Sequence, residues 1–369
     1  MLKIQDSNSP ESNLLHECLL SAFKEAGEGA GAYAFATSDG VDLLLKDSVF
    51  EEYISNNNYR LIIGIDAITN SGAINKLLDF QKKYKDNLKI SVFINPDYNS
   101  TFHPKFSWFR NNSGGLLIIG SGNLTVGGLR NNKEAFATIA LTKKAFGETK
   151  KTWNNWLNEN EKNLKELSDE IVSKKAAQNK TVRVNTRKET KEKPKEIIIL
   201  DKVEEGDAED CWYISESSKV LLAEIPKNGT RISQVNFNKK SFEEFFKATA
   251  GVNNNYRILL KNYNKNSIFS DVEIRQSVSV ISSNFRFELK AISGISYPKK
   301  GMPIGVFVET GIRTFIYTIF MPEEKNYSEI VEFMYSNKSN QRDAVRIISD
   351  VKAVKEACPN IVLWNLIQD

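Results

Sequence analysis

A short segment of the chain collects residue types that can catalyse reactions of phosphate esters. It reads FHPKFSWFRNNSGGLLIIGSGNLTVGGLRNNKEAFAT and contains His103, Lys105, Ser121, Asn123 and Glu134. An imidazole can act as nucleophile or proton carrier, while an ammonium group and an amide can hold phosphate oxygens. A carboxylate can fix the tautomer of the imidazole. Residues of these types at adjacent strand ends suit phosphate chemistry.

Two short apolar segments are predicted to position these side chains. Bulky residues alternate in Phe102–Phe109 and run together in Leu116–Gly120, so both segments are predicted to be strands. His103 and Lys105 are two positions apart, which places them on one face of the first strand. The serine and the asparagine follow the second strand in a glycine-rich bend, and the glutamate starts a third apolar run, EAFATIAL.

Each of these residues also has an ordinary interpretation. A single histidine on a strand is usually a hydrogen-bonded structural residue, a nearby lysine is usually a solvated charge, and GSGNLTVGG is compatible with a plain glycine-rich loop. The joint pattern is more informative, because the chain contains only two histidines, His16 and His103, and one of them lies in the motif. The combination therefore favours a phosphodiesterase site.

The His-x-Lys pair followed by Gly-Ser-x-Asn resembles the signature of the phospholipase D superfamily. The glutamate about one turn and one strand later resembles the one-motif branch of BfiI-like and NgoFVII-like restriction endonucleases. The broader superfamily has an aspartate five residues after the lysine, where this chain has Arg110. The GSGN turn also comes slightly later than in the lipid-cleaving members. Both differences favour the restriction-enzyme branch.

The chemistry of these groups gives each residue an expected role. His103 attacks phosphorus and forms a phosphohistidine, while Lys105 and Asn123 hold the non-bridging oxygens and Ser121 adds a hydroxyl donor. Glu134 orients an imidazole. A second histidine must protonate the leaving oxygen and then activate water. Because the chain has no second motif copy, that histidine is predicted to come from another subunit of a two-fold homodimer. Clustered carboxylates are missing, so neither a metal nor another cofactor is predicted.

Length and composition suit two domains in a mildly basic protein. The chain has 369 residues, a net charge of +4 and 41% hydrophobic residues. This charge permits a nucleic-acid partner without requiring one. Three widely separated cysteines suggest a reducing compartment. A leader and a membrane-spanning apolar run are not evident in the sequence, so a cytoplasmic protein of a prokaryote without a membrane partner is expected.

Residues 1–180 are predicted to form an α/β phospholipase D-like nuclease domain, a mixed sheet with flanking helices and the motif strands at its centre. A first helix is expected to be capped at Ser9-Pro10-Glu11, with His16 beside its apolar stripe in a structural role. Further expected elements are strands at Ala32–Thr37, Arg60–Ile65 and Lys89–Asn95, helices at Asp47–Ile54 and Gly72–Tyr84, and a long helix from Phe146 to about Lys180.

Residues 181–199 are predicted to be a basic linker. The stretch from Lys174 to Glu196 holds nine Lys or Arg and three Glu with few large apolar residues, which is typical of a solvated tether. A second interpretation is that this stretch contacts phosphates or lies over the catalytic groove until DNA binds.

Residues 200–369 are predicted to be mainly β. Short strands are expected between turn signals, with a helix after Asn326 and another from about Gln341 to Ala357. The strands are expected at Ile197–Leu200, Trp212–Ile214, Lys219–Ile225, Tyr256–Leu260, Ser277–Ile281, Arg286–Ala291, Ile304–Val308 and Thr314–Phe320.

The order of elements in this part resembles the B3-like DNA-recognition domain of the same restriction enzymes, an open barrel with two arms in the major groove. Two polar stretches match the arms, and their residue types pair with base edges and phosphates. Ordinary turns are the alternative. The candidate DNA-binding residues are Lys227, Arg231, Ser233, Gln234, Asn236, Lys239, Lys240, Ser283, Asn284 and Arg286.

The sequence thus favours a sequence-specific, metal-independent endonuclease of a restriction-modification system that acts on double-stranded DNA. A GxxxxGK[ST] loop is missing, so any ATPase that assists it would be a separate subunit. The alternatives are a nonspecific or ATPase-partnered nuclease of the same superfamily, a phospholipid phosphodiesterase, and a DNA-binding module with a vestigial site. The intact set of catalytic residues argues against the last alternative.

Overall fold

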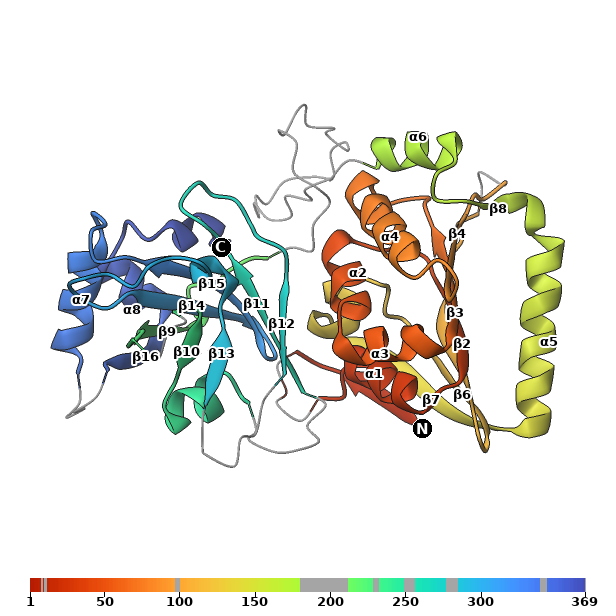
Figure 1. Ribbon diagram of the computed structural model, residues 1–369, viewed down its shortest axis with the longest axis horizontal. Coiled ribbons are helices and arrows are strands. Elements are labelled where there is room, and N and C mark those ends of the chain that lie inside the picture. Colours follow the sequence, from red (N-terminus) through yellow and green to blue (C-terminus); the bar gives the residue numbers. More distant parts are fainter. Residues whose placement is uncertain are drawn as a thin grey trace, which may run out of the picture.

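The computed structural model describes most of the chain in two halves, each built on a β-sheet (Figure 1). The described residues are 1–7, 9, 12–96, 100–179, 212–227, 232–248, 256–276, 285–338 and 344–368. The predicted linker, the strands expected at Ile197–Leu200 and Ser277–Ile281, and Arg231, Ser283 and Asn284 lie outside these ranges. The boundaries 1–180 and 200–369 therefore remain a prediction.

The described strands of the N-terminal half form one eight-stranded sheet in the order β1-β7-β6-β5-β2-β3-β4-β8. Three neighbouring strands, β2, β3 and β4, are parallel, and the other pairs are antiparallel. The strands are β1 (Leu2–Gln5), β2 (Glu28–Tyr33), β3 (Asn58–Gly64), β4 (Leu88–Phe93), β5 (Lys105–Asn111), β6 (Gly114–Gly120), β7 (Glu134–Thr142) and β8 (Leu164–Lys165). The predicted mixed sheet is confirmed, with the motif strands β5 and β6 inside it.

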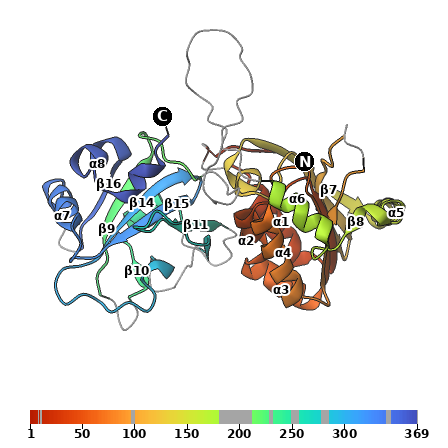
Figure 2. The same cartoon turned by 90° about the horizontal axis from the view of Figure 1, so that it is seen from above.

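Helices cover both faces of this sheet. Helices α1–α4 lie between the sheet and the second half, while α5 lies on the opposite face (Figures 1 and 2). The helices are α1 (Leu15–Glu25), α2 (Ser38–Leu45), α3 (Ser48–Asn56), α4 (Ser71–Lys83), α5 (Lys143–Glu159) and α6 (Glu170–Gln178), with the short turns η1 (Gly127–Asn131) and η2 (Glu161–Asn163). Strands β3 and β4 are buried along most of their length.

Side-chain caps define where several helices begin. Thr37, Asp47 and Asn70 each accept a hydrogen bond from a backbone N–H in the first turn of α2, α3 and α4. The first helix differs from its prediction. It begins at Leu15, and its N-terminal residue Leu14 makes no side-chain cap, so the signal at Ser9 does not start it. Ser9 instead accepts a backbone hydrogen bond from Ser12 N (3.0 Å).

Two other helix predictions were wrong in extent. The predicted long helix is interrupted: α5 ends at Glu159, the chain crosses to β8, and α6 begins after the cap Asp169. Asn160 lies at the break and is a poor helix former. Near the C-terminus, Arg346–Asp350 forms strand β16 rather than helix, because it pairs with β9 and completes the sheet edge. The predictions also missed α2 and β1.

The described residues of the second half form a six-stranded sheet in the order β12-β11-β15-β14-β9-β16 and a separate two-stranded ribbon, β10-β13. The strands are β9 (Lys219–Glu224), β10 (Gln234–Asn236), β11 (Arg257–Asn262), β12 (Glu273–Gln276), β13 (Arg286–Glu288), β14 (Ile304–Gly311), β15 (Thr314–Phe320) and β16 (Arg346–Asp350). The helices are α7 (Tyr327–Ser336) and α8 (Val351–Ala357), with the short turns η3 (Ser241–Phe245), η4 (Lys290–Ile292) and η5 (Val362–Leu366). The mainly-β composition is confirmed, whereas the B3-like assignment remains a prediction.

The two halves share buried structure. One cluster of buried apolar side chains includes Leu19 and Leu44 of the first half and Trp212 and Leu259 of the second. A separate cluster, rich in phenylalanine, packs between the ribbon and the six-stranded sheet. The contact between the halves is thus part of the core.

In the described part of the chain, no helix is both long and apolar enough to cross a membrane.

Candidate active site

The motif residues lie at the end of the N-terminal sheet where β2 and β6 finish and β5 and β7 start. Register brings them together, because Lys105 pairs with Tyr33 and Gly120 pairs with Phe136. The same end holds the carboxyl ends of the parallel strands, which is where ligands usually bind in open α/β sheets. We call this end of the sheet the catalytic edge.

His103 and Lys105 are in contact at this edge. The Lys105 Nζ lies 3.0 Å from His103 Nδ1 and 3.1 Å from Nε2, and it donates a 3.2 Å hydrogen bond to the His103 carbonyl. The imidazole is exposed, whereas Lys105 is only 9% exposed. Burial lowers the pKa of Lys105, and the charge of Glu134 opposes that shift. Strand β5 begins at Lys105, so His103 precedes the strand, contrary to the prediction.

Asn123 is held in a defined orientation. Its side-chain oxygen accepts a 3.2 Å hydrogen bond from the backbone N–H of Phe35, which leaves its NH₂ group to act as a donor. The ring of Phe35 meets the His103 imidazole edge-on at a centroid distance of 5.8 Å. Close packing also fixes the turn. If Gly128 had a side chain, its Cβ would lie only 2.4 Å from the backbone nitrogen of Asn123. The glycine is therefore required there.

Ser121 and Glu134 form a second hydrogen-bonded group. The Ser121 hydroxyl donates to Glu134 Oε2, and Asn132 donates to Oε1 at 3.2 Å. The backbone N–H of Ala135 donates to the serine oxygen at 3.1 Å. Among the described residues, Glu134 makes no hydrogen bond to His103 of its own chain. Its carboxylate is thus ordered by other groups while Glu134 itself remains partly exposed.

His16, the other histidine, is structural, as predicted. It is fully buried, and its Nε2 lies 3.0 Å from the carbonyl oxygen of Leu43. Its Nδ1 lies 3.4 Å from a guanidinium nitrogen of Arg130. Burial lowers the pKa of His16, and the charges of Arg130 and Arg257 lower it further. A neutral, enclosed imidazole of this kind has no access to a substrate.

Three residues in or near the site carried little signal in the sequence. Phe35 follows β2 and fixes both Asn123 and the position of the imidazole. Asn132 donates a hydrogen bond to Glu134. Its position in the motif segment, two residues before the glutamate, could have indicated this contact. Arg130, in the same segment, is fully buried and donates from its Nη2 atom to the carbonyls of Arg257 and Ile312, both at 2.9 Å.

The two predicted DNA-binding arms meet in the β10-β13 ribbon. Asn236 pairs with Arg286, and Gln234 pairs with Glu288. Ser233, by contrast, is buried and bonds Glu288 at 3.4 Å, which favours a structural role for it.

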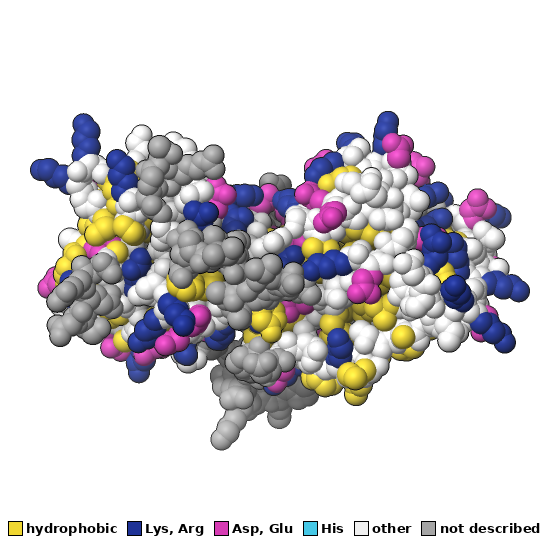
Figure 3. Space-filling model, turned by 60° about the horizontal axis from the view of Figure 1, so that its bottom comes forward, with side chains coloured by type: hydrophobic (Ala, Val, Ile, Leu, Met, Phe, Trp, Pro, Cys, Tyr) yellow, Lys and Arg dark blue, Asp and Glu magenta, His cyan; other side chains and the backbone are white. Residues whose placement is uncertain are grey.

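The described lysines of these arms are solvent-exposed. Lys227 and Lys240 are exposed, and Lys239 forms a loose helical ion pair with Glu243 at 3.9 Å. Lys and Arg side chains are scattered among Asp and Glu over the face shown in Figure 3. Binding of a long polyanion on this face would therefore depend on individual contacts more than on a single basic stripe.

The described part of the chain contains no group of three or more His, Cys, Asp or Glu residues that could hold a metal ion. The residues described at the catalytic edge include an imidazole, an ammonium group, the amides of Asn123 and Asn132, a hydroxyl and a carboxylate. This set can bind an oxyanion and attack it with a ring nitrogen, which is the chemistry of a covalent phosphoryl or acyl transfer.

Comparisons with known proteins give partial likenesses. No protein-family model and no curated protein sequence matches the chain. Similar solved structures include Nuc of Salmonella typhimurium, a phospholipase D family member, with 14% identity over 43% of this chain and 94% of that one and a TM-score of 0.33. NucT of Helicobacter pylori has 18% identity over 40% of this chain and 87% of that one, with a TM-score of 0.28.

A third similar structure is the N-terminal domain of Helicobacter pylori LlaJI.R1, with 15% identity over 36% of this chain and 97% of that one and a TM-score of 0.22. The three TM-scores are low, so these likenesses carry no argument about function. What the site can do follows from its own side chains.

Proposed function

We propose that the chain is a metal-independent endonuclease that cleaves double-stranded DNA through a phosphohistidine, with the specificity of a restriction enzyme. The observation that carries this proposal is the geometry of the catalytic edge. An exposed imidazole, a mostly buried lysine in contact with it and an oriented asparagine amide lie together at strand ends. These are the groups needed to bind a phosphodiester and attack it.

In the first step, a ring nitrogen of His103 attacks phosphorus, and the bond from phosphorus to the leaving sugar oxygen breaks. Lys105 and the Asn123 NH₂ group stabilise the charge on the non-bridging oxygens, where Ser121 can add a hydroxyl. An acid gives its proton to the leaving oxygen. In the second step, water attacks phosphorus, the nitrogen–phosphorus bond breaks, and the same group takes the proton of the water.

The acid has to come from outside this chain's own site. His16 is enclosed in the core, and Glu134 is held by Ser121 and Asn132. His103 of the partner subunit in a two-fold dimer supplies the missing imidazole, and Glu134 would orient that ring. The exposure of His103 supports this arrangement, because an exposed ring can be shared across an interface.

The second half is proposed to read the DNA sequence as a B3-like domain. The joining of the two predicted arms in one ribbon supports this role, as do the half-buried Gln234, Asn236 and Arg286 along it. Contacts from Lys239 and Lys240 to phosphates would position the duplex, and the ribbon side chains would contact base edges.

The test is incubation of the purified chain with a sequenced plasmid in EDTA. The wild type should give discrete fragments, and His103→Ala should give none, with a loss of about a thousandfold or more. Lys162→Ala changes an exposed lysine elsewhere and should cut like the wild type. A smear of products would contradict sequence specificity. Cleavage that needs added Mg²⁺, or that survives His103→Ala, would contradict the chemistry.

A further inference from the structure

A row of four register partners crosses the face of the N-terminal sheet that α5 borders. Trp108 on β5 pairs with Ala30 on β2, Ala30 pairs with Arg60 on β3, and Arg60 pairs with Lys89 on β4. Register partners on a sheet project from the same face. The row thus places the buried Ala30 between Trp108 and Arg60, and Arg60 beside Lys89.

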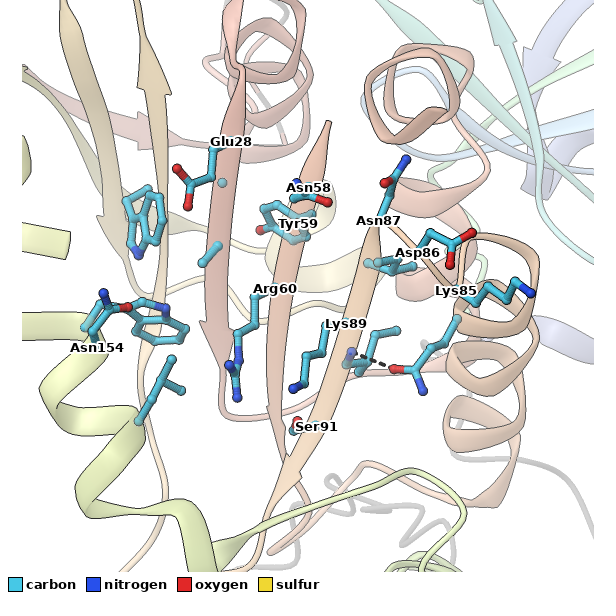
Figure 4. Close-up of a pocket in the computed structure, with 18 of the residues that line it drawn as sticks. Glu28, Asn58, Tyr59, Arg60, Lys85, Asp86, Asn87, Lys89, Ser91 and Asn154 are labelled. Atoms are coloured by element: carbon cyan, nitrogen blue, oxygen red, sulfur yellow. Dashed lines mark hydrogen bonds between the residues drawn. The ribbon is translucent and has the colours of Figure 1, made fainter. Parts of the chain in front are cut away.

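Helix α5 covers this part of the sheet only in part, through Trp153 and Leu157, which belong to one buried cluster with Ala30 and Ile62. It packs over β6 and β7, while a groove of about 710 Å³ remains over β2, β3 and β4. The groove lies between α5 and the region of α4, and the Arg60 and Lys89 side chains extend into the same space (Figure 4). Asn154 of α5 lies across from them. A space of this volume is large enough for a small ligand.

Arg60 and Lys89, two of the cationic residues that line the groove, lack carboxylate partners among the described residues. Among the described residues, no Asp or Glu oxygen lies within 4.0 Å of a charged nitrogen of Arg60 or Lys89. Glu28, which also lines the groove, is already paired with Arg110 at 3.3 Å and with Lys150 at 2.7 Å. Like charges on directly opposed strand positions are destabilising. The sheet thus keeps an uncompensated pair of positive charges side by side.

Unpaired donors accompany these charges. The Arg60 Nε and the Trp108 Nε1 are both buried and have no hydrogen-bond partner among the described residues, and Trp108 is only 2% exposed. Burial also lowers the pKa of Arg60. The groove additionally contains the carboxylates of Asp86 and Glu166, which belong to the residues around β4 and α6. An acceptor-rich ligand would satisfy the donors on the Arg60 side of the groove.

We propose that this groove is a second, non-catalytic site that binds the phosphate group of a small phosphate-bearing molecule between Arg60 and Lys89. The site is separate from the catalytic edge, because it lies at the amino-terminal ends of β2, β3 and β4, whereas the catalytic residues lie at the opposite end of the sheet. The size of the groove leaves room for a sugar and a base beside the phosphate. The proposal does not depend on the nuclease activity.

Calorimetric titration of the full chain tests the site. The catalytic edge can also bind phosphate, so the titrations use Lys105→Gln as the parent protein. Inorganic phosphate and deoxyadenosine monophosphate are added at constant ionic strength against sodium chloride. Both should bind the parent, and adding Arg60→Gln or Lys89→Gln should weaken binding at least about tenfold, which corresponds to the loss of one charge-assisted hydrogen bond. Adding Lys162→Gln, the matched exposed control, should change nothing.

Two further readouts separate binding from a structural effect. Arg60→Gln should leave the midpoint of thermal unfolding unchanged or raise it, because it removes a like-charge contact. Phosphate should shift the indole N–H resonance of Trp108, assigned with Trp108→Phe, and should not shift it in Arg60→Gln. Tighter binding of the nucleotide than of phosphate would place sugar and base in the groove, while equal binding would assign the site to phosphate alone.

The proposal is overturned if the Lys105→Gln protein binds neither probe more tightly than about 1 mM, the limit of weak association. It is also overturned if Arg60→Gln leaves both affinities unchanged. Either result is independent of plasmid cleavage, so it says nothing against the nuclease proposal.

Discussion

The catalytic edge and the interface between the two halves both gather cations and carboxylates, but they differ in exposure and in how the charges are paired. At the interface, Arg257 makes two hydrogen bonds to Asp47, at 2.6 and 3.2 Å, and both side chains are at most 3% exposed. At the catalytic edge, His103 is exposed, and Lys105 contacts the imidazole rather than a carboxylate. The interface charges are thus buried and paired with each other, whereas the histidine of the catalytic edge is accessible to solvent.

The buried ion pairs of the interface join carboxylates of the first half to cations of the second. Two pairs that are more exposed have the opposite polarity, because Lys46 and Lys76 of the first half both bind Asp271. Lys261 donates to Asp39, which also accepts a 2.8 Å bond from the indole of Trp212. Arg313 bonds Glu17 at 2.7 Å. Arg257 and Lys261 both lie on β11, whereas their partners lie at the starts of α3 and α2. This charge complementarity fixes how the second sheet sits on the helices.

This difference in pairing separates the charges that stabilise the fold from the charges that are available to bind a substrate. A buried charge must be paired, because an unpaired one costs several kcal/mol. Charges at the interface follow this rule, and their loss is expected to unfold the protein. The lysine of the catalytic edge lacks a carboxylate within ion-pair distance among the described residues, which leaves it free to bind a substrate oxyanion. Its loss is expected to affect activity alone.

Lys105→Met and Arg257→Met should therefore give opposite results. The first should lower cleavage by about a hundredfold or more, the range for removal of one oxyanion-stabilising group, with little change in stability. The second should lower the free energy of unfolding by about 3–5 kcal/mol, because it leaves Asp47 buried and unpaired. Urea denaturation and plasmid cleavage below the unfolding transition measure the two effects.

The control for this comparison is the double variant Arg257→Met with Asp47→Leu. It removes both charges, so it should be more stable than Arg257→Met alone. Asp47→Leu alone is measured as well. If the double variant loses as much stability as Arg257→Met and Asp47→Leu lose when their separate effects are added, the two residues are not coupled. If Lys105→Met unfolds the protein as severely as Arg257→Met, the distinction between the two regions fails.

A smaller effect is expected from His16, which lies in the first half beside the interface arginines. Its pKa in the folded protein is lowered by burial and by Arg130 and Arg257. Below its usual value of about 6.5, the unfolded chain therefore binds a proton that the folded chain does not. Stability should fall as the pH drops through that value, by up to about 1.4 kcal/mol per pH unit.

Urea denaturation between pH 7.5 and 5 measures this slope. His16→Gln has no titrating group at the position and should lack the His16 contribution, whereas His103→Ala, at an exposed position, should keep it. Identical slopes for all three proteins would show that His16 does not titrate in this way.

The sequence predicted the elements whose signals are local. The apolar runs located β3, β4, β14 and β15. The motif residues were proposed as a site on their types and spacing, and the structure brings them together at one end of the sheet. Strand β15 was predicted with its observed bounds, Thr314–Phe320. The Ser9 signal failed, because a capping residue promotes a helix only where the following residues can pack, and the buried residues of this segment begin at Leu14, just before the helix.

Long-range contacts could not be predicted in this way. The interface partners Arg257 and Asp47 are 210 positions apart, and nothing in the sequence around either residue marks it as part of an ion pair. Phe35 orients Asn123 through a backbone N–H that any residue except proline would provide. Arg130 belongs to the motif segment but turns away from the catalytic edge to bind carbonyls of the second half. Its role depends on tertiary structure alone.

The shared use of His103 by two subunits is the central claim, and subunit mixing tests it most directly. Wild-type protein and His103→Ala are mixed equally, allowed to exchange, and assayed on a cleavable plasmid, while light scattering verifies that the mixture remains dimeric. Random pairing leaves both histidines in about a quarter of the dimers. We predict that activity per total dimer falls to about that quarter. A fall to about half would contradict the account, because each subunit would then cut with a complete site of its own.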